Sequence, residues 1–119
     1  MRTLLRMLVL NRFKVSPDVQ DGFVTRAHAA LAALAERPGY QSGRLTRALD
    51  DPTYWTLVTQ WESVGAYRRA LSNFDVKVQA TPLLAESIDE PSAYETLASA
   101  AQGGPVVVTD SDRAAEQWR

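Results

Sequence analysis

The most constraining feature of this sequence is the run YWTLVTQWES at residues 54–63. Aromatic and β-branched residues dominate it, as is typical of a strand. In a strand, alternate side chains share a face, and here one face carries Trp55, Leu57, Thr59 and Trp61. Ser63 is a good helix N-cap residue. We therefore expect a strand over 53–62, with two indoles on one face, that leads directly into a helix over 63–72.

A strand and a longer helix are predicted upstream of this run. Residues 3–15 are rich in Leu, Val and Phe, and one face of the predicted strand carries Leu5, Met7, Val9, Asn11 and Phe13. Ser16 followed by Pro17 favours a helix start, so we expect a helix over 17–36 with Ser16 as its N-cap. Its apolar stripe consists of Val19, Phe23, Ala27, Ala30, Leu31 and Leu34.

The remaining segments complete a recognisable order of elements. Residues 40–49 alternate like a strand, and the turn at 50–52 pairs them with the strand over 53–62. Asn73 and Pro82 should break 73–88 into short helical pieces, and a fourth strand is expected over 92–98. The order β-α-β-β-α-β predicts an α+β, ferredoxin-like fold in which both helices cover one face of a four-stranded antiparallel sheet.

The other face of this sheet also needs cover, because Leu4, Leu8 and Leu10 project from it. We expect two copies to pair through these faces into a dimeric α+β barrel. After residue 98 the composition shifts to Ala, Gly, Gln and Asp, so we divide the chain into a domain over 1–98 and a tail over 99–119. The three valines at 106–108 fit either an edge strand on the partner subunit or a disordered end, and the sequence does not choose between them.

Composition excludes several classes of function. The chain has 119 residues, which is the size of one domain, and a formal net charge of -1, so no basic field attracts nucleic acid. The absence of cysteine excludes thiolate catalysis and cysteine-ligated metals, and a single histidine excludes two-histidine metal motifs. Arg6 interrupts the apolar N-terminal run and no segment is long enough for a membrane span, so we expect a cytoplasmic protein without membrane contacts.

Three short motifs give the chain a resemblance. Pro38-Gly39-Tyr40 precedes the second predicted strand, Trp61-Glu62-Ser63 ends the third, and Tyr94-Glu95 lies in the fourth. Together they resemble the antibiotic biosynthesis monooxygenase family over roughly residues 3–98. The resemblance implies a homodimer that oxidises a hydroxylated aromatic small molecule, such as a quinol or an anthrone, with O2 and without a bound cofactor or metal.

The resemblance also implies candidate site residues. In haem-degrading relatives, an asparagine late in strand one and a tryptophan that ends strand three line the pocket beneath the helices; Asn11 and Trp61 match these positions. The axial histidine of those relatives lies on helix two, where this chain has Ala70 and Leu71. Three functions are considered: oxygenation without a cofactor, ligand binding without turnover, and haem degradation. This departure makes haem degradation the least favoured of them.

We assign candidate catalytic roles to Asn11, Trp61 and Tyr67. An amide on an apolar strand face is suited to stabilise an anion that develops on a substrate oxygen. The predicted substrate-binding residues are Trp55, Phe74, Met7, Phe13 and Phe23, whose flat or apolar side chains suit an aromatic ligand. The competing interpretation is that Asn11 only caps a backbone group and the aromatic side chains only fill the core.

A second class of function stays open at this point. The same fold can serve as a dimeric module that binds a small apolar ligand, or as a structural partner, without turnover. An enzyme should bring the polar groups of Asn11 and a tyrosine or arginine together at one site, whereas a scaffold should not.

Overall fold

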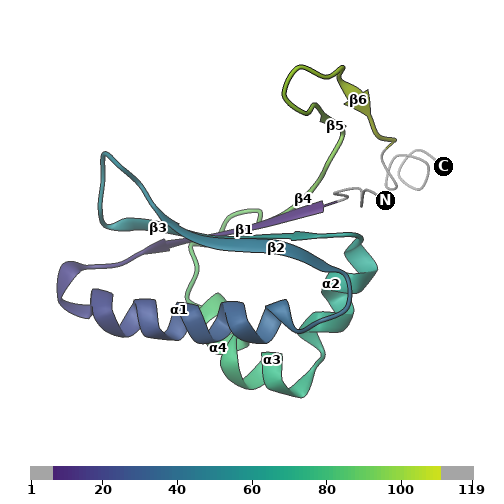
Figure 1. Ribbon diagram of the computed structural model, residues 1–119. Helices are drawn as coiled ribbons and strands as arrows, with labels where there is room; N and C mark the ends of the chain where they lie inside the picture. Colours follow the sequence, from purple (N-terminus) through teal and green to yellow (C-terminus); the bar gives the residue numbers. More distant parts are fainter. Residues whose placement is uncertain (1–6, 111–119) are drawn as a thin grey trace.

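The computed structural model describes residues 7–110 (Figure 1). The strands are β1 (Met7–Lys14), β2 (Tyr40–Arg47), β3 (Tyr54–Trp61), β4 (Ala93–Glu95), β5 (Ala98–Ser99) and β6 (Val107–Val108). The helices are α1 (Gln20–Ala35), α2 (Val64–Leu71), α3 (Phe74–Gln79) and α4 (Thr81–Leu84), and a 3₁₀ turn, η1, spans Pro17–Val19. No helix in this part of the chain is long and apolar enough to cross a membrane.

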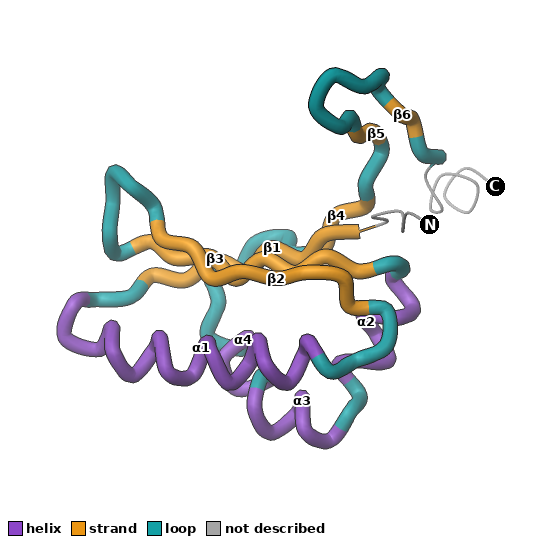
Figure 2. The backbone as a smooth tube through the Cα atoms, viewed as in Figure 1, coloured by secondary structure: helices purple, strands orange, loops and turns teal. Residues whose placement is uncertain are grey.

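Four strands form one antiparallel sheet in the order β2-β3-β1-β4. Within residues 7–110 the four α-helices lie on one side of this sheet, and no helix of this part of the chain lies on the other side (Figures 1 and 2). This arrangement confirms the α+β, ferredoxin-like fold predicted from the order of elements. β1 and β3 are the two inner strands; β1 pairs with β3 along its whole length and with β4 through Met7–Val9.

The alternation of the sequence defines the two faces of the sheet. Along β1 the side chains at positions 7, 9, 11 and 13 are buried, whereas those at 8, 10 and 12 are only half-buried. We call the helix-covered side the inner face; on β1 and β3 it carries Met7, Val9, Asn11, Phe13, Trp55, Leu57, Thr59 and Trp61. The opposite side is the outer face, which includes Leu8, Leu10, Val58 and Gln60. The predicted division of β1 is therefore confirmed for the described residues; Leu4 and Leu5 lie outside them.

The long helix begins later than predicted. Residues 17–19 form a 3₁₀ turn, in which the Val19 amide donates to the Ser16 carbonyl at 3.1 Å, and α1 starts only at Gln20. Ser16 takes the predicted N-cap position with Pro17 directly after it, but it does so for this 3₁₀ turn rather than for α1, and its side chain makes no capping hydrogen bond. Val19 is exposed rather than part of the stripe, because the tighter turn rotates it away from the helix face that packs on the sheet. The buried face of α1 consists of Phe23, Ala27, Ala30, Ala33 and Leu34.

The two caps after β3 explain how the chain leaves the sheet. The Ser63 hydroxyl accepts from the Ala66 amide at 3.0 Å and starts α2, as predicted. The Asn73 side chain accepts from the Val76 amide at 3.1 Å. Asn73 therefore begins α3, two residues after α2 ends at Leu71.

The C-terminal part of the prediction needs correction. The strand expected over 92–98 is shorter in the structure: β4 spans Ala93–Glu95 and pairs with Met7–Val9 of β1. Ala98 and Ser99 then pair with Val108 and Val107, so the three-valine segment forms a hairpin with its own chain. This hairpin spans the predicted boundary at residue 98. The end of the predicted tail, 111–119, lies outside the described residues.

Gly39 offers a direct test of how the loop into β2 packs. Its φ of 90° lies in the left-handed region, and a Cβ there would collide with the Ala66 side chain and lie 3.3 Å from Glu62 Cγ. We expect Gly39→Ala to lower the free energy of unfolding by about 2 kcal/mol. Gly22→Ala in α1 is the matched control, because nothing lies within 4 Å of its Cβ position, and it should be neutral or slightly stabilising. Equal losses in urea titrations of the two variants would contradict this account.

Candidate active site

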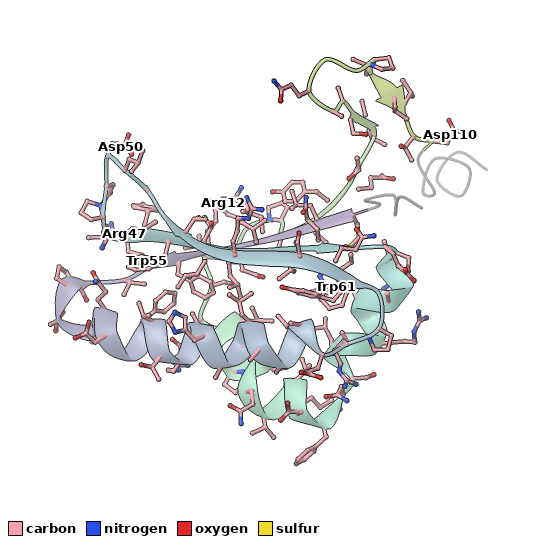
Figure 3. The ribbon with its side chains drawn as sticks, in the orientation of Figure 1. Arg12, Arg47, Asp50, Trp55, Trp61 and Asp110 are labelled. Carbon is pink, nitrogen blue, oxygen red and sulfur yellow. The ribbon has the colours of Figure 1, made fainter. Side chains whose placement is uncertain are left out.

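The inner face carries two separate groups of aromatic side chains. Trp55 and Trp61 lie beneath opposite ends of the strands, between the sheet and the helices (Figure 3). Their positions on β3 differ by six. Because side chains alternate between the two faces of a strand, an even difference places both on the same face. Each is the centre of one group, which we name the Trp55 cluster and the Trp61 cluster.

The Trp61 cluster consists of Tyr40, Trp61 and Tyr67. The ring centroids of Trp61 and Tyr40 are 5.3 Å apart at 88°, and those of Trp61 and Tyr67 are 5.4 Å apart at 57°. Trp61 is completely buried, and its Nε1 donates to the Thr59 hydroxyl at 2.8 Å. The indole is therefore held in one orientation by a hydrogen bond along its own strand. The prediction placed Trp61 and Tyr67 near one another, and the structure brings them into contact.

Tyr40 was not among the predicted site residues. A bulge at Gln41 shifts the pairing of β2 with β3, so that Tyr40 pairs with Trp61 while Gly43 pairs with Thr59. Simple alternation would place positions 40 and 43 on opposite faces, but the extra residue puts both on the inner face. The Tyr40 hydroxyl lies over Gly43, where no Cβ blocks it. The sequence signal for this residue is its position directly after Pro38-Gly39, but the bulge itself has no clear signature.

The Trp55 cluster consists of Phe13, Phe23 and Trp55. Phe23 of α1 lies between the other two rings, with centroids 5.1 Å from Phe13 and 5.5 Å from Trp55. The Arg47 guanidinium lies over the Trp55 ring, 5.3 Å from its centroid. Trp55 is only 7% exposed, yet its Nε1 has no hydrogen-bond partner. A buried donor without an acceptor is costly and is uncommon in folded proteins.

Asn11 lies between the two clusters on β1. Its pairing partner on β3 is Leu57, and the adjacent inner-face pair is Phe13 with Trp55. At about 3.3 Å per residue, Asn11 is roughly 7 Å along the strand from the Trp55 cluster and roughly 13 Å from the level of Trp61. The side chain is 8% exposed, and within residues 7–110 its amide forms no hydrogen bond. The sequence prediction treated Asn11 and Trp61 as one pair, but the register places a further inner-face pair, Val9 and Thr59, between them.

The other predicted residues divide between the core and the surface. Met7 is fully buried beside Trp61, its partner on β3. Phe74 is 79% exposed and does not reach the inner face. Val76 is the buried residue of α3, and a position two residues earlier points about 200° away around the helix. Phe74 was predicted to bind the substrate, but in the structure it does not lie at the inner face with the other predicted residues. His28 is exposed on α1.

A surface depression lies outside this inner-face set. It has a volume of about 330 Å³ and lies where the loop after α1 meets α2, with Arg37, Ala66, Arg69 and Asn73 among its lining residues. None of the predicted site residues lines it. In the described chain, neither arginine is paired with a carboxylate.

Comparison with known families agrees with this architecture. The family model described as "Antibiotic biosynthesis monooxygenase" matches residues 6–78, which is more than half of the chain. The chain belongs to this family. The match includes β1, β2, β3 and both aromatic clusters, and it ends before β4 and the C-terminal hairpin. A comparison with curated protein sequences finds no match.

Solved structures share the same fold. A conserved protein from Methanosarcina mazei Go1 has a TM-score of 0.64 at 19% identity, over 77% of this chain and 93% of its own. SnoaB, a cofactor-independent oxygenase from Streptomyces nogalater, has a TM-score of 0.62 at 25% identity, over 78% of this chain and 90% of its own. A Nitrosomonas europaea protein named for the same family has a TM-score of 0.63 at 15% identity, over 82% of this chain and 96% of its own.

The environment of the two tyrosines in the Trp61 cluster sets their protonation. Burial raises the pKa of Tyr67, and burial also raises the pKa of the half-buried Tyr40. Within residues 7–110 neither hydroxyl forms a hydrogen bond. Both phenols therefore keep their protons at neutral pH and are suited to donate a hydrogen bond rather than to accept a proton.

The raised pKa of Tyr67 predicts a loss of stability in alkali. In the unfolded chain a tyrosine ionises near pH 10, whereas the folded protein keeps this proton to higher pH. The unfolded state then binds fewer protons, so the free energy of unfolding falls as the pH rises above about 10. Urea titrations at pH 8 and at about pH 11 should show a larger loss for wild type than for Tyr67→Phe. Identical pH dependence would mean that this phenol is solvated in the folded protein.

Proposed function

We propose that this protein is a cofactor-independent monooxygenase that oxidises a hydroxylated aromatic small molecule, of the quinol or anthrone type, with O2. The observation that carries the proposal is the amide of Asn11, which forms no hydrogen bond within residues 7–110 although the residue is only 8% exposed; unlike the Trp55 Nε1, its amide atoms keep some contact with solvent and are open to a ligand. It lies on an apolar strand face, between two groups of aromatic rings. A protein gains no stability from such an amide, so we assign its donors to a ligand.

The comparisons support this class of reaction. Members of the antibiotic biosynthesis monooxygenase family act on small molecules with O2 and often form dimers. SnoaB is described as a cofactor-independent oxygenase, and its 25% identity extends over most of both chains. The family match also covers all of the residues that we place at the site.

Asn11 supplies the charge stabilisation that this reaction requires. A hydroxylated aromatic must lose a proton before it reacts readily with O2, and the negative charge then resides on its oxygen. The Asn11 amide offers two N–H donors to that oxygen, in a region from which water is largely excluded. The unpaired Nε1 of Trp55 lies one inner-face position away and offers a third donor.

The chemistry uses only the substrate and O2. In an anthrone, deprotonation gives an electron-rich anion, which transfers one electron to O2. The two radicals combine to form a carbon–oxygen bond, and the resulting peroxide takes up a proton. Loss of water then leaves a carbonyl at the former CH2 position, so one oxygen atom enters the quinone product and the other leaves as water. The protein has to hold the ring, stabilise the anion and exclude bulk water.

The aromatic side chains serve to position the substrate. Trp61 and Trp55 provide flat walls at the two ends of the inner face, and the separation between Asn11 and Trp61 suits a fused polycyclic ring system. Tyr67 keeps its proton because burial raises its pKa, so its role is to donate a hydrogen bond. Met7, Phe13 and Phe23 complete the apolar surroundings. Trp61 is fully enclosed, so a substrate has to displace Tyr67 or Tyr40 to reach it.

We infer that two copies pair through their outer faces into an α+β barrel. Leu8, Leu10 and Val58 are only half-buried on this face, and Tyr94 next to Leu8 is also exposed to solvent. A sheet face of this composition is stabilised by a second layer. The cytoplasmic location and the absence of a cofactor stay predictions from the sequence.

A non-catalytic module that binds a small apolar ligand is the second candidate. Two observations favour it. Met7 and Trp61 are completely enclosed. The inner face of β1 and β3 also presents no carboxylate or imidazole that could take the substrate proton. Haem degradation is the third candidate, and it lacks an axial ligand, because the single histidine of the sequence is exposed on α1.

The Asn11→Leu variant separates these roles. It removes the amide while keeping a similar side-chain volume. If Asn11 serves a ligand, oxygen uptake with a panel of quinols and anthrones should fall about 100-fold or more, while the free energy of unfolding stays constant or rises by about 1 kcal/mol. Gln79→Leu, which removes an amide from α3, should leave uptake unchanged.

Two outcomes would count against the proposal. If wild-type protein consumes no O2 above the uncatalysed rate, but binds the aromatic compounds through Asn11, the binding module becomes the better description. If Asn11→Leu lowers the free energy of unfolding, as the loss of a capping residue does, Asn11 has a structural role. The proposed anion-binding role of Asn11 is then wrong.

A further inference from the structure

The surface depression next to α2 is separate from the inner-face site. It lies at the end of the molecule where α1 stops and the chain turns into β2 (Figure 1). We call it the α2 depression; its lining residues include Arg37, Ala66, Arg69, Ala70 and Asn73. Its volume of about 330 Å³ is at the lower end of the range for pockets that hold small molecules. Of the described residues that line it, none is acidic and none belongs to either aromatic cluster.

Helical spacing forms the floor of the α2 depression. Ala66, Arg69 and Ala70 are related by steps of three and four residues, which places them on one side of α2. Both alanines are buried, and their small side chains leave an apolar hollow. Arg69 is exposed, and Asn73 follows directly after α2 at the same hollow. The depression therefore combines an apolar floor with a polar rim.

Two arginines reach this rim from different segments of the chain. Arg37 is half-buried in the loop after α1, and Arg69 lies in the last turn of α2. Within residues 7–110 neither guanidinium forms an ion pair or a hydrogen bond, whereas Arg12 and Arg26 each pair with a glutamate. Each guanidinium offers five N–H donors in a planar fork. Two such forks at one cavity without a carboxylate of its own are suited to an anion.

The surroundings limit the charge of this anion. α1 ends at Ala35 and α2 ends at Leu71, so the negative ends of two helix dipoles lie close to the depression. They disfavour a doubly charged ligand such as phosphate, whereas a single carboxylate matches the planar forks. The Asn73 oxygen accepts from the Val76 amide at 3.1 Å, and within residues 7–110 its amino group makes no hydrogen bond. That group supplies a further neutral donor.

A structural role for the arginines is the competing explanation. Arginines near the C-terminal end of a helix offset its dipole, and Arg68 and Arg69 both lie in the last turn of α2. Offsetting the dipole does not require a cavity, however, and Arg68 does not line the α2 depression. The convergence of Arg37 and Arg69 from two segments on one hollow is the observation that indicates a ligand.

We propose that the α2 depression binds a small organic monocarboxylate. Its carboxylate bridges Arg37 and Arg69, and its apolar body covers Ala66 and Ala70. The site is separate from the inner face, and the inference does not depend on the oxidation chemistry proposed above.

The occupant also links the two segments that enclose Trp61. The loop that carries Arg37 leads directly into Tyr40, and the helix that carries Arg69 also carries Tyr67. The rings of both tyrosines contact Trp61. A carboxylate that bridges the loop and the helix therefore holds both segments in the closed arrangement.

The test is a titration of the ¹⁵N-labelled full-length chain with sodium benzoate at constant ionic strength. We expect saturable shifts of the amide signals of residues 36–40 and 65–73, with a dissociation constant of about 1 mM or below. Benzamide has a similar shape but no charge, so it should bind at least about tenfold more weakly.

Two arginine variants form a matched pair. Arg69→Gln and Arg68→Gln each remove one charge from the last turn of α2, but only Arg69 lines the depression. We expect Arg69→Gln to weaken benzoate binding about tenfold or more, and Arg37→Gln to do the same from the other segment. Arg68→Gln should keep the wild-type dissociation constant. Equal constants for Arg69→Gln and Arg68→Gln would overturn the proposal.

Two further results would also overturn it. One is the absence of saturable shifts up to about 20 mM benzoate. The other is a set of shifts centred on Asn11 and Trp55, which would place the benzoate ring at the inner face instead. Neither result bears on whether the protein consumes O2 with quinols or anthrones, so the oxygen-uptake test of the proposed function stays independent.

Discussion

A single sheet with helices on only one side determines most of this structure. The small alanines of α1 and α2 allow close packing on the inner face, which buries Met7, Leu57 and Trp61. No element of residues 7–110 covers the outer face in the same way, so half-buried leucines and valine remain there. The dimer that we propose follows from this asymmetry.

The inner face combines tight packing with unpaired polar groups. In the Trp61 cluster the indole donor is satisfied by Thr59, so this tryptophan has a fixed orientation. The indole donor of Trp55 is buried without a partner, and the amide of Asn11 forms no hydrogen bond within residues 7–110 although that residue is only 8% exposed. Packing alone would favour apolar residues at these two positions. These two groups are the physical basis on which we propose a site for an oxygen-bearing aromatic.

Much of the fold was predictable because its signals are local. Alternation in β1 and β3, the Ser63 cap and the order of elements depend on residues close to one another in the chain. The errors occurred where a local signal competed with a different geometry. Ser16-Pro17 favoured a helix start, but a 3₁₀ turn delayed it, and β4 ended at Glu95 while Ala98 and Ser99 pair with Val108 and Val107 instead.

The sequence by itself determined which residues share a strand face, since alternation follows directly from backbone geometry. The family resemblance pointed to Asn11 and Trp61 as candidate residues, and alternation added Trp55 because it shares a face with Trp61. Only the tertiary structure decided how they combine. Strand register separates Asn11 from Trp61, a bulge adds Tyr40 to the Trp61 cluster, and helix rotation removes Phe74. These outcomes depend on contacts between segments distant in sequence, whose relative positions no local pattern specifies.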